Sequence, residues 1–391
     1  MFSSRTTGEL QPNSLTRAIR RARASGRQVI DLTVTNPTTC GFAYPPALLA
    51  SLADPAAATY DPQPLGARGA RDAVARDYAR RGFRVDPYRV VLTASTSEAY
   101  SILFKLLCDP AGDSVLVPAP SYPLFEHLTA LDGVSAATYP LEYHGRWTVD
   151  FRALDDRWTA NVRAVLAVSP NNPTGSILAP EEFDRLARWC VERGTALILD
   201  EVFADYPLNG APVPYAIPSS GPLTFRLGGL SKSIGLPQVK LGWIAVDGPE
   251  PLVTEALQRL ELICDTYLSV STPVQAAAPR LLADGAVVRD QILARVRGND
   301  LALQRSAERF PSVEPLRTEA GWSAVLRVPA TRTEEELVLE LLVRDDVLVH
   351  PGYFFDFPRE AYIVLSLLPE PDVFAEGVRR LLLKCGQQSS P

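Results

Sequence analysis

Histidine and cysteine are scarce in this sequence of 391 residues, and neither residue type is clustered. The three histidines lie far apart, no HExxH motif occurs, and the five cysteines show no CxxC spacing, so we expect no metal site. An odd number of dispersed cysteines is typical of reduced thiols in the cytoplasm. No apolar run reaches the roughly 18 residues of a membrane span, and the first residues lack the apolar core of a secretory signal. The sequence therefore predicts a soluble, cytoplasmic protein.

Positive charge is also in short supply. Lysine and arginine number 39 against 45 aspartates and glutamates, which gives a net charge of −6. Because no excess of basic residues is available to neutralise phosphates, nucleic acid is not expected as a main partner. The hydrophobic fraction of 46% and the charged fraction of 21% are those of an ordinary globular enzyme. A chain of this length exceeds one compact core, so we expect two or three domains.

Short apolar segments alternate with amphipathic helices from about residue 90 onward, which predicts an α/β fold with a mostly parallel sheet. The expected strands cover residues 90–92, 114–117, 165–168, 196–199, 225–227 and 243–246. Beyond about residue 285 a charged helix precedes alternating strands at 323–326 and 362–366, which indicates a smaller α+β domain. We expect three parts: an N-terminal arm with part of the small domain at 1–45, a large domain with a seven-stranded type of sheet flanked by helices at 46–285, and a small C-terminal domain at 286–391.

Polar residues follow the expected strands, where ligands bind in open α/β sheets. Ser95 and Glu98 have capping-box spacing after the first strand, so the helix that begins there offers unpaired N–H groups to an anion. The hydroxyls of Thr96 and Ser97 lie alongside, although a plain helix cap would use the same residues. After the second strand, Tyr122 stands between prolines, where it could stack on a planar ligand or simply form a turn.

Three further strand ends complete this pattern. Asn172 follows the third strand and could donate its amide to a ligand, or serve turn chemistry alone. Asp200 closes a wholly apolar strand, and a buried carboxylate there needs a partner such as a protonated pyridine nitrogen, unless it caps a helix. Lys232 follows the fifth strand among small residues, where loss of water lowers an amine's pKa and suits Schiff-base formation. A lone lysine is usually a surface residue, but five such groups at successive strand ends predict one site.

Several motifs occur in a characteristic order along nearly the whole chain: NPT at Asn36, then YDPQPLG, PSYP, NNPTG, DEVF, LSKSIGLPQVKLGW and HPG at His350. By these motifs the chain resembles the class I/II aminotransferases, which are pyridoxal 5′-phosphate (PLP) enzymes of fold type I in the aspartate aminotransferase superfamily. The resemblance implies that Lys232 holds PLP as an internal aldimine and then moves the proton between the substrate's Cα and the cofactor's C4′. It also implies that Asp200 pairs with the pyridinium nitrogen, that Asn172 donates to the ring's 3-oxygen, and that Tyr122 stacks on the ring.

The resemblance further implies a phosphate site and a partner subunit. Ser95, Thr96 and Ser97 would bind the phosphate, with Lys240 as its countercharge. Tyr60 would reach the phosphate of the neighbouring subunit, which implies an obligate homodimer with shared active sites. The implied activity is transfer of an amino group between an amine or amino acid donor and a keto acid, in a biosynthetic role.

Four positions depart from the family pattern. Phe203 replaces a tyrosine that donates to the 3-oxygen, and Gly229 replaces a serine near the phosphate. Lys240 replaces the phosphate-binding arginine, which keeps the charge but loses the bidentate geometry. Val364 stands where the family has the arginine that binds the substrate's carboxylate.

The last departure suggests an atypical substrate. If residues 362–366 form a strand, Val364 shares a face with Tyr362 and Ser366, and we expect that face to line the cleft without a cation. Arg359 and Arg226 are the nearest candidates to replace the missing arginine.

Two alternatives to an aminotransferase stay open at this point. A PLP-dependent decarboxylase, lyase or oxidase could share all these residues, because substrate orientation over the ring decides which bond breaks. A catalytically silent regulator is the other alternative. Intact Lys232 and Asp200, and the lack of room for a DNA-binding domain before Ser14, argue against it.

Overall fold

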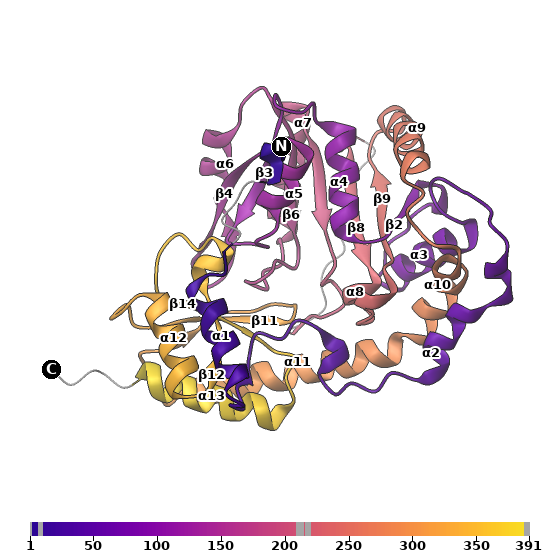
Figure 1. The fold of residues 1–391 in the computed structure, drawn as a ribbon. Coiled ribbons are helices and arrows are strands. Elements are labelled where there is room, and N and C mark those ends of the chain that lie inside the picture. The colour runs from indigo at the N-terminus through magenta and orange to yellow at the C-terminus, as the bar shows by residue number, and fades with distance from the viewer. Residues whose placement is uncertain (1, 7–10, 209–214, 216–219, 387–391) are drawn as a thin grey trace.

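The computed structural model describes residues 2–6, 11–208, 215 and 220–386, and an eight-stranded sheet forms its centre (Figure 1). Across this sheet the strands follow the order β2 (Val90–Thr93), β9 (Gly242–Asp247), β8 (Thr224–Gly229), β7 (Ala196–Asp200), β6 (Val162–Val168), β3 (Ser114–Ala119), β4 (Ser135–Tyr143) and β5 (Trp147–Val149). From β8 to β4 neighbouring strands are parallel, whereas β9 is antiparallel to both of its neighbours. The mostly parallel sheet is therefore confirmed, and it contains all six strands expected in its region.

Two strands at one edge of this sheet were not expected. In β4 exposed and buried residues are mixed and Pro140 interrupts the run, while β5 has three residues and pairs with β4 alone. Neither strand has the long apolar run of a strand buried on both faces, because β4 carries exposed residues and β5 has only three residues. The sheet consequently has one strand more than the seven expected.

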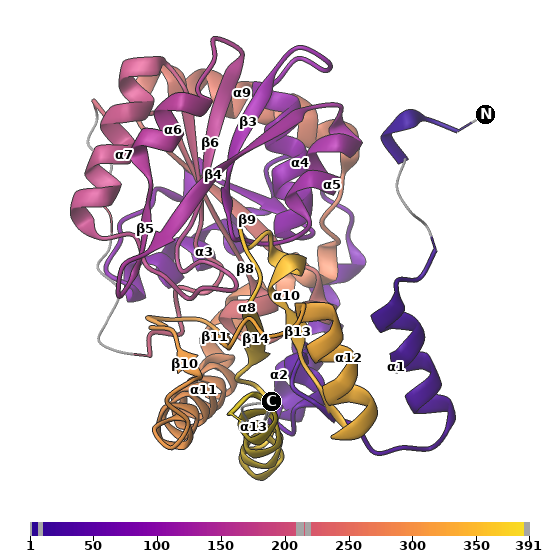
Figure 2. The ribbon, with the colours of Figure 1, turned by 90° about the vertical axis from the view of Figure 1, so that its left-hand side faces the viewer.

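Helices cover both faces of the large sheet (Figure 2). One face is packed by α4 (Thr96–Leu107), α5 (Phe125–Asp132) and α9 (Glu250–Tyr267). The opposite face is packed by α3 (Arg68–Arg80), α6 (Phe151–Arg157) and α7 (Pro180–Arg193), with α10 (Thr272–Asp284) against α3. The sheet is thus buried on both sides, which explains why its central strands are apolar without interruption.

Helix α7 begins where its sequence predicts. Pro180 occupies the first turn, where its missing N–H costs no hydrogen bond. The Glu182 carboxylate accepts a hydrogen bond from the Ala179 N–H at 2.9 Å, so an acidic side chain satisfies a free donor at the positive end of the helix.

The C-terminal part of the chain forms a smaller antiparallel sheet. Its strands follow the order β10 (Glu314–Pro315), β11 (Ser323–Arg327), β14 (Tyr362–Ser366) and β13 (His350–Pro351). Around it lie α11 (Ala286–Ala307), α12 (Glu334–Arg344) and α13 (Pro371–Gly386). The long helix α11 runs from the large sheet toward this smaller one (Figure 1).

The N-terminal segment joins the C-terminal one. Strand β1 (Ile30–Asp31) pairs in parallel with β12 (Val347–Leu348), and α1 (Ser14–Ala24) packs on α12. Helix α1 buries Leu15, Ala18 and Ala22, so its apolar stripe faces the protein. Among the described helices, none is both long enough and apolar enough to cross a membrane.

Candidate active site

Five strands of the large sheet end at the same edge and bring the predicted polar residues there. These strands are parallel to one another, so their carboxyl ends point the same way. Their last residues are Thr93 (β2), Ala119 (β3), Val168 (β6), Asp200 (β7) and Gly229 (β8). The short helix α8 (Leu230–Ser233), which carries Lys232, follows β8 directly.

A cavity of about 190 Å³, here called the strand-end cavity, opens at this edge. Six of the predicted site residues line it: Thr96, Ser97, Tyr122, Asn172, Asp200 and Lys232. The sequence placed these residues on five different segments, and the fold brings them around one space.

The start of helix α4 forms one wall of the strand-end cavity. The Ser95 Oγ accepts a hydrogen bond from the Glu98 N–H at 3.1 Å, as the capping spacing predicts. The first N–H groups of the helix have no acceptor within it, and together with the positive helix end they favour an anion. At Gly242 a Cβ would lie 2.9 Å from the Ser95 carbonyl carbon and 3.0 Å from the Thr96 nitrogen, so glycine lets β9 pass close to this helix start.

The Asp200 carboxylate is buried at the end of β7 and is held by two hydrogen bonds. The Tyr100 hydroxyl donates to Oδ2 at 2.6 Å, and the Val202 N–H donates to Oδ1 at 3.0 Å. Burial raises the pKa of Asp200 to about 6, although both hydrogen bonds act to lower it. In the described part of the chain no cation forms an ion pair with Asp200, and Lys232 acts on it only from a distance. A buried carboxylate in this condition is suited to a cationic ligand atom.

The Lys232 amine lies among aromatic rings. Its Nζ is 5.0 Å from the centre of the Trp322 ring and 5.6 Å from that of Phe203. Burial lowers the pKa of Lys232 to about 8, and the Asp200 charge opposes this shift only in part. A sizeable fraction of the amine is therefore neutral near neutral pH, which makes it a nucleophile and a base.

The loops after β3 and β6 are tied together by Asn171. Its amide donates to the Pro120 carbonyl at 3.0 Å, and its Oδ1 accepts from the Ser121 hydroxyl at 2.8 Å. This buried link holds the two loops together. It thereby fixes Tyr122, which follows Ser121, and Asn172, which follows Asn171; both line the strand-end cavity. The first asparagine of the pair thus supports the loops, and the second faces the strand-end cavity.

Three predicted residues do not line the strand-end cavity. Ser95 caps α4 beside it, and Lys240 is exposed before β9 in a left-handed conformation with φ of 61°. Tyr60 is 69% exposed and lies in a separate hollow with Ser269 and Thr272.

The expected role of the Val364 face is wrong. Residues 362–366 form β14 as predicted, but Val364 is buried in the same hydrophobic cluster as Phe355 and Phe357 and does not line the strand-end cavity. The neighbouring hydroxyls are also occupied: the Ser366 Oγ donates to the Val34 carbonyl at 2.5 Å, and the Tyr362 hydroxyl accepts from Arg359. The strand was predicted correctly, but packing against the aromatic residues of the preceding loop turns this face into core.

Neither candidate for the missing arginine reaches the strand-end cavity. Arg359 is exposed and donates to the Tyr362 hydroxyl at 3.3 Å. Arg226 is buried, and its Nη1 donates to Glu201 at 2.7 Å.

Among the lining residues that the sequence analysis did not predict are Thr35, Tyr100, Trp322 and Ser323. Tyr100 lies inside a helix rather than at a strand end, and the other three come from segments far away in the sequence. The sequence offers one signal for Trp322, because it stands between Gly321 and the predicted strand at 323–326.

The described residues fit PLP. The free carboxylate of Asp200 suits a protonated ring nitrogen, the start of α4 suits a phosphate, and the Lys232 amine suits an aldehyde. Together with the order of the sheet, this arrangement defines a PLP-dependent transferase of fold type I.

The chain belongs to the aminotransferase class I and II family, whose model matches residues 14–370. It is 28% identical to an alanine aminotransferase of Mycobacterium tuberculosis over 374 residues, which cover 92% of this chain and 86% of that protein. It is 25% identical to the glutamate-pyruvate aminotransferase AlaA of Escherichia coli, over 90% of this chain and 89% of that one. The protein is therefore a PLP-dependent aminotransferase, which acts on amino acid and keto acid substrates.

Solved structures show the same fold. An aminotransferase from Escherichia coli superposes with a TM-score of 0.87 at 23% identity, and the match covers 99% of both chains. An alanine aminotransferase from Pyrococcus furiosus gives a TM-score of 0.87 at 21% identity, over 98% of this chain and 99% of that one.

Proposed function

We propose that this aminotransferase uses Lys232 as its covalent PLP attachment and catalytic base, and takes its amino group from a donor whose carboxylate is not gripped by an arginine. One observation carries this proposal: Lys232 is the single basic side chain among the described residues that line the strand-end cavity. The two arginines considered as replacements do not reach this cavity: Arg226 donates to Glu201 and Arg359 donates to the Tyr362 hydroxyl. The preferred donor is therefore an amine, or an apolar amino acid whose carboxylate is bound by uncharged groups such as Thr35 or Ser323.

Lys232 and Asp200 have different roles in the proposed reaction. Bound PLP supplies an electron-accepting ring for the bond that breaks at the substrate's α-carbon. The Lys232 Nζ would take the proton from that carbon and deliver it to the C4′ carbon of the cofactor, a role that its pKa of about 8 suits near neutral pH. Asp200, whose pKa of about 6 leaves it ionised at neutral pH, would hold the proton on the ring nitrogen, while the Tyr100 hydroxyl fixes the orientation of the carboxylate at 2.6 Å.

The remaining residues orient the cofactor. Tyr122 would stack on its ring and Asn172 would donate to the ring oxygen, since both line the strand-end cavity. Ser95, Thr96 and Ser97 would hold the phosphate at the start of α4. Lys240 would add long-range positive charge from outside, because it does not line the cavity.

A second candidate is transamination of alanine with a keto acid. It is favoured by the names of the relatives, an alanine aminotransferase and a glutamate-pyruvate aminotransferase. This candidate requires that uncharged groups bind the α-carboxylate as tightly as an arginine would, and a charge-assisted contact contributes about 1.5–3 kcal/mol.

A half-reaction assay separates the two candidates. The holoenzyme is mixed with alanine, glutamate, aspartate, an apolar amino acid and simple amines, and the cofactor absorbance is followed as it converts to the pyridoxamine form. We expect alanine, glutamate and aspartate to react slowly with high KM. Fast conversion with any of these three at micromolar KM, unchanged in Arg359→Ala, would overturn the proposal in favour of ordinary amino acid donors.

We also propose a cytoplasmic homodimer with shared active sites. Tyr60 supports the shared site, because it is far more exposed than a catalytic residue of its own chain would be and lies beside Ser269 and Thr272 rather than in the strand-end cavity. The cytoplasmic location rests on the odd number of cysteines, all five of which are buried and free.

A further inference from the structure

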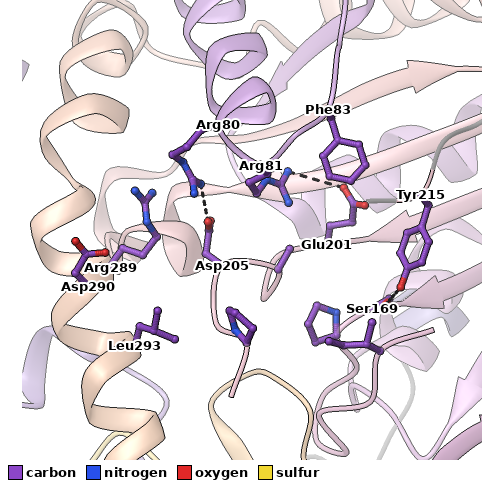
Figure 3. A pocket seen from close by; sticks show the side chains of 14 residues that line it. Arg80, Arg81, Phe83, Ser169, Glu201, Asp205, Tyr215, Arg289, Asp290 and Leu293 are labelled. Atoms are coloured by element: carbon purple, nitrogen blue, oxygen red, sulfur yellow. Dashed lines mark hydrogen bonds and ion pairs between the residues drawn. The ribbon is translucent and has the colours of Figure 1, made fainter. Parts of the chain in front are cut away.

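A second and larger cavity, of about 380 Å³, is lined in part by residues of the loops that form the active site (Figure 3). We call it the arginine cavity. Neighbouring residues of the same loops face the two spaces: Ser169 lines the arginine cavity and Asn172 the strand-end cavity. In the same way Glu201 lines the arginine cavity, and Asp200 lines the strand-end cavity. The strand-end cavity accounts for the chemistry proposed above, so the arginine cavity has no function yet.

Most charged groups around the arginine cavity neutralise one another. Arg80 forms ion pairs with Asp77 at 3.0 Å and with Asp205 at 2.5 Å. Glu201 is shared by Arg226 at 2.7 Å and Arg81 at 3.9 Å. These pairs involve three guanidinium groups and three carboxylates, so they leave no net charge.

Arg289, on α11, remains outside this network. Its side chain is buried, with only 7% of the residue exposed, and its Nη1 is buried without a hydrogen-bond partner. Within the described ranges Arg289 forms no ion pair, and the adjacent Asp290 is exposed and equally unpaired. An arginine keeps its charge at any ordinary pH, so a buried and unpaired guanidinium costs free energy unless an anion binds to it.

Arg289 also lies close to a second positive charge. Burial raises the pKa of the Tyr206 hydroxyl well above its usual value, and Asp205, Arg289 and Arg80 all act electrostatically on this hydroxyl. Figure 3 shows Arg289, Arg80 and Asp205 toward the same end of the cavity. Arg80 is already paired with Asp77 and Asp205, so Arg289 is the guanidinium at this end that forms no ion pair within the described residues.

Glu201 supplies a second group with an unused acceptor. Its Oε2 is buried and forms an ion pair with the Arg81 Nη2 at 3.9 Å, but it accepts no hydrogen bond, whereas the opposite oxygen accepts from Arg226. A buried free acceptor is satisfied best by a donor on a ligand.

We propose that the arginine cavity binds a small acid whose oxyanion, a carboxylate or a phosphate, contacts Arg289 and whose hydroxyl or ammonium group donates to Glu201. This is a second ligand site, separate from the substrate site. Because the loops around Asp200 and Asn172 border both cavities, an occupant of the arginine cavity is placed to influence the cofactor site.

Binding to the holoenzyme tests the proposal, with L-malate, succinate and inorganic phosphate as probes at constant ionic strength. Titration calorimetry measures each Kd for the wild-type protein, for Arg289→Gln and for Arg305→Gln, an exposed arginine on the same helix. We expect Arg289→Gln to weaken binding by about tenfold or more, and Arg305→Gln to leave it unchanged. Malate should bind more tightly than succinate, because only malate carries a hydroxyl for Glu201. Phosphate binding as tight as malate would identify a phosphate ester as the class, and weak phosphate binding a carboxylic acid.

Two outcomes would overturn the proposal. One is binding that persists in Arg289→Gln, because the probes would then occupy the substrate site. The other is a loss of stability in Arg289→Gln without any anion. If the guanidinium is unpaired in the free protein, its replacement by a neutral amide leaves the melting temperature equal or higher.

Arg289→Lys should bind the probes more weakly than wild type but measurably, because it keeps the charge and loses the bidentate geometry.

Discussion

Burial shifts the pKa values of Lys232 and Asp200 toward each other, to about 8 and about 6. At the scale of single residues this is the main property of the site. The lysine would otherwise be fully protonated at neutral pH, and the aspartate would be ionised with little cost. Shifts of this kind are concentrated at catalytic sites, because a proton can be exchanged there near the working pH.

Lys232→Ala should abolish both functions of the amine. We expect turnover to fall by about a thousandfold or more, because the covalent attachment and the catalytic base are lost together. Borohydride reduction of the wild-type holoenzyme should leave PLP covalently bound to the peptide that contains Lys232, and mass spectrometry would detect it. Lys105→Ala, on the outer surface of α4, is the matched control and should keep the label. A labelled Lys232→Ala protein would show that another lysine binds the cofactor.

Asp200→Asn should stabilise the protein without PLP, in a pH-dependent way. The folded pKa of about 6 lies above the ordinary value of 3.8, so the wild type loses stability as the pH rises through this window. The amide does not titrate, and the variant should gain up to about 3 kcal/mol relative to wild type at pH 7 and almost nothing near pH 4. Urea unfolding of both proteins without cofactor, at several pH values, measures this difference. With PLP bound the sign should reverse, since the variant lacks the charge that holds the ring proton.

A stability difference that does not change between pH 4 and pH 7 would mean that Asp200 is not the titrating group. The neutral Tyr100→Phe variant then serves as a check. This variant lacks one hydrogen bond that stabilises the ionised carboxylate. The stability that is lost as the pH rises should therefore be larger in Tyr100→Phe than in the wild type.

The site residues that directly follow a strand could be predicted from the sequence. Asp200 and Lys232 follow strands, so their position could be read from the sequence once the strands were recognised. Trp322 and Thr35 could not be found in this way, because they come from distant segments that reach the cavity only after the chain has folded. The Val364 face failed for a related reason: alternation along a strand gives two faces, but not which of them is covered by core.

At the scale of elements, the site depends on how closely β9 approaches the start of α4. Gly242→Ala would place a methyl group about 3 Å from the backbone of Ser95 and Thr96, closer than real contacts permit. Since backbone cannot rotate away, the helix start must shift. We expect weaker PLP binding and a lower melting temperature, measured by cofactor titration and thermal unfolding. The destabilisation should lie in the range of about 1–3 kcal/mol that overpacking causes.

Gly298→Ala is the matched control for this change. Gly298 lies on the exposed side of α11, and a Cβ there meets nothing within 4 Å. Alanine is the better helix former by about 0.8–1 kcal/mol, so this variant should be slightly more stable and should bind PLP as the wild type does. Equal PLP affinity in both variants would show that the helix start does not hold the phosphate.

The elements themselves were predictable where burial on both faces leaves an apolar run. Strands β6 and β7 are of this kind, and the helix start at Pro180 follows from local backbone chemistry. Strand β4, which lies next to the edge strand β5, was not predictable, because its exposed residues and Pro140 are equally common in loops.

At the scale of the whole molecule, the proposed homodimer makes a composite active site from two chains. Tyr60→Phe and Lys232→Ala should each be poorly active alone at low PLP concentration. Mixed after dissociation, they should recover about a quarter of the wild-type activity, because half of the dimers then contain one intact site out of two. Activity assays on the reassociated mixture measure the recovery. Light scattering that shows a fully active monomer, or a mixture without recovery, would contradict the shared site.

The pairing of β1 with β12 has a consequence for protein synthesis. Residues 30 and 31 leave the ribosome before their strand partners at residues 347 and 348, and the whole large sheet is made between them. The Ser366 hydroxyl, which donates to the Val34 carbonyl, comes later still. Throughout translation of the large sheet, the N-terminal segment therefore has an open strand edge and the apolar stripe of α1 without a cover. Chaperones bind such surfaces. We therefore expect a nascent chain of this enzyme to depend on chaperones during the time between synthesis of β1 and synthesis of β12.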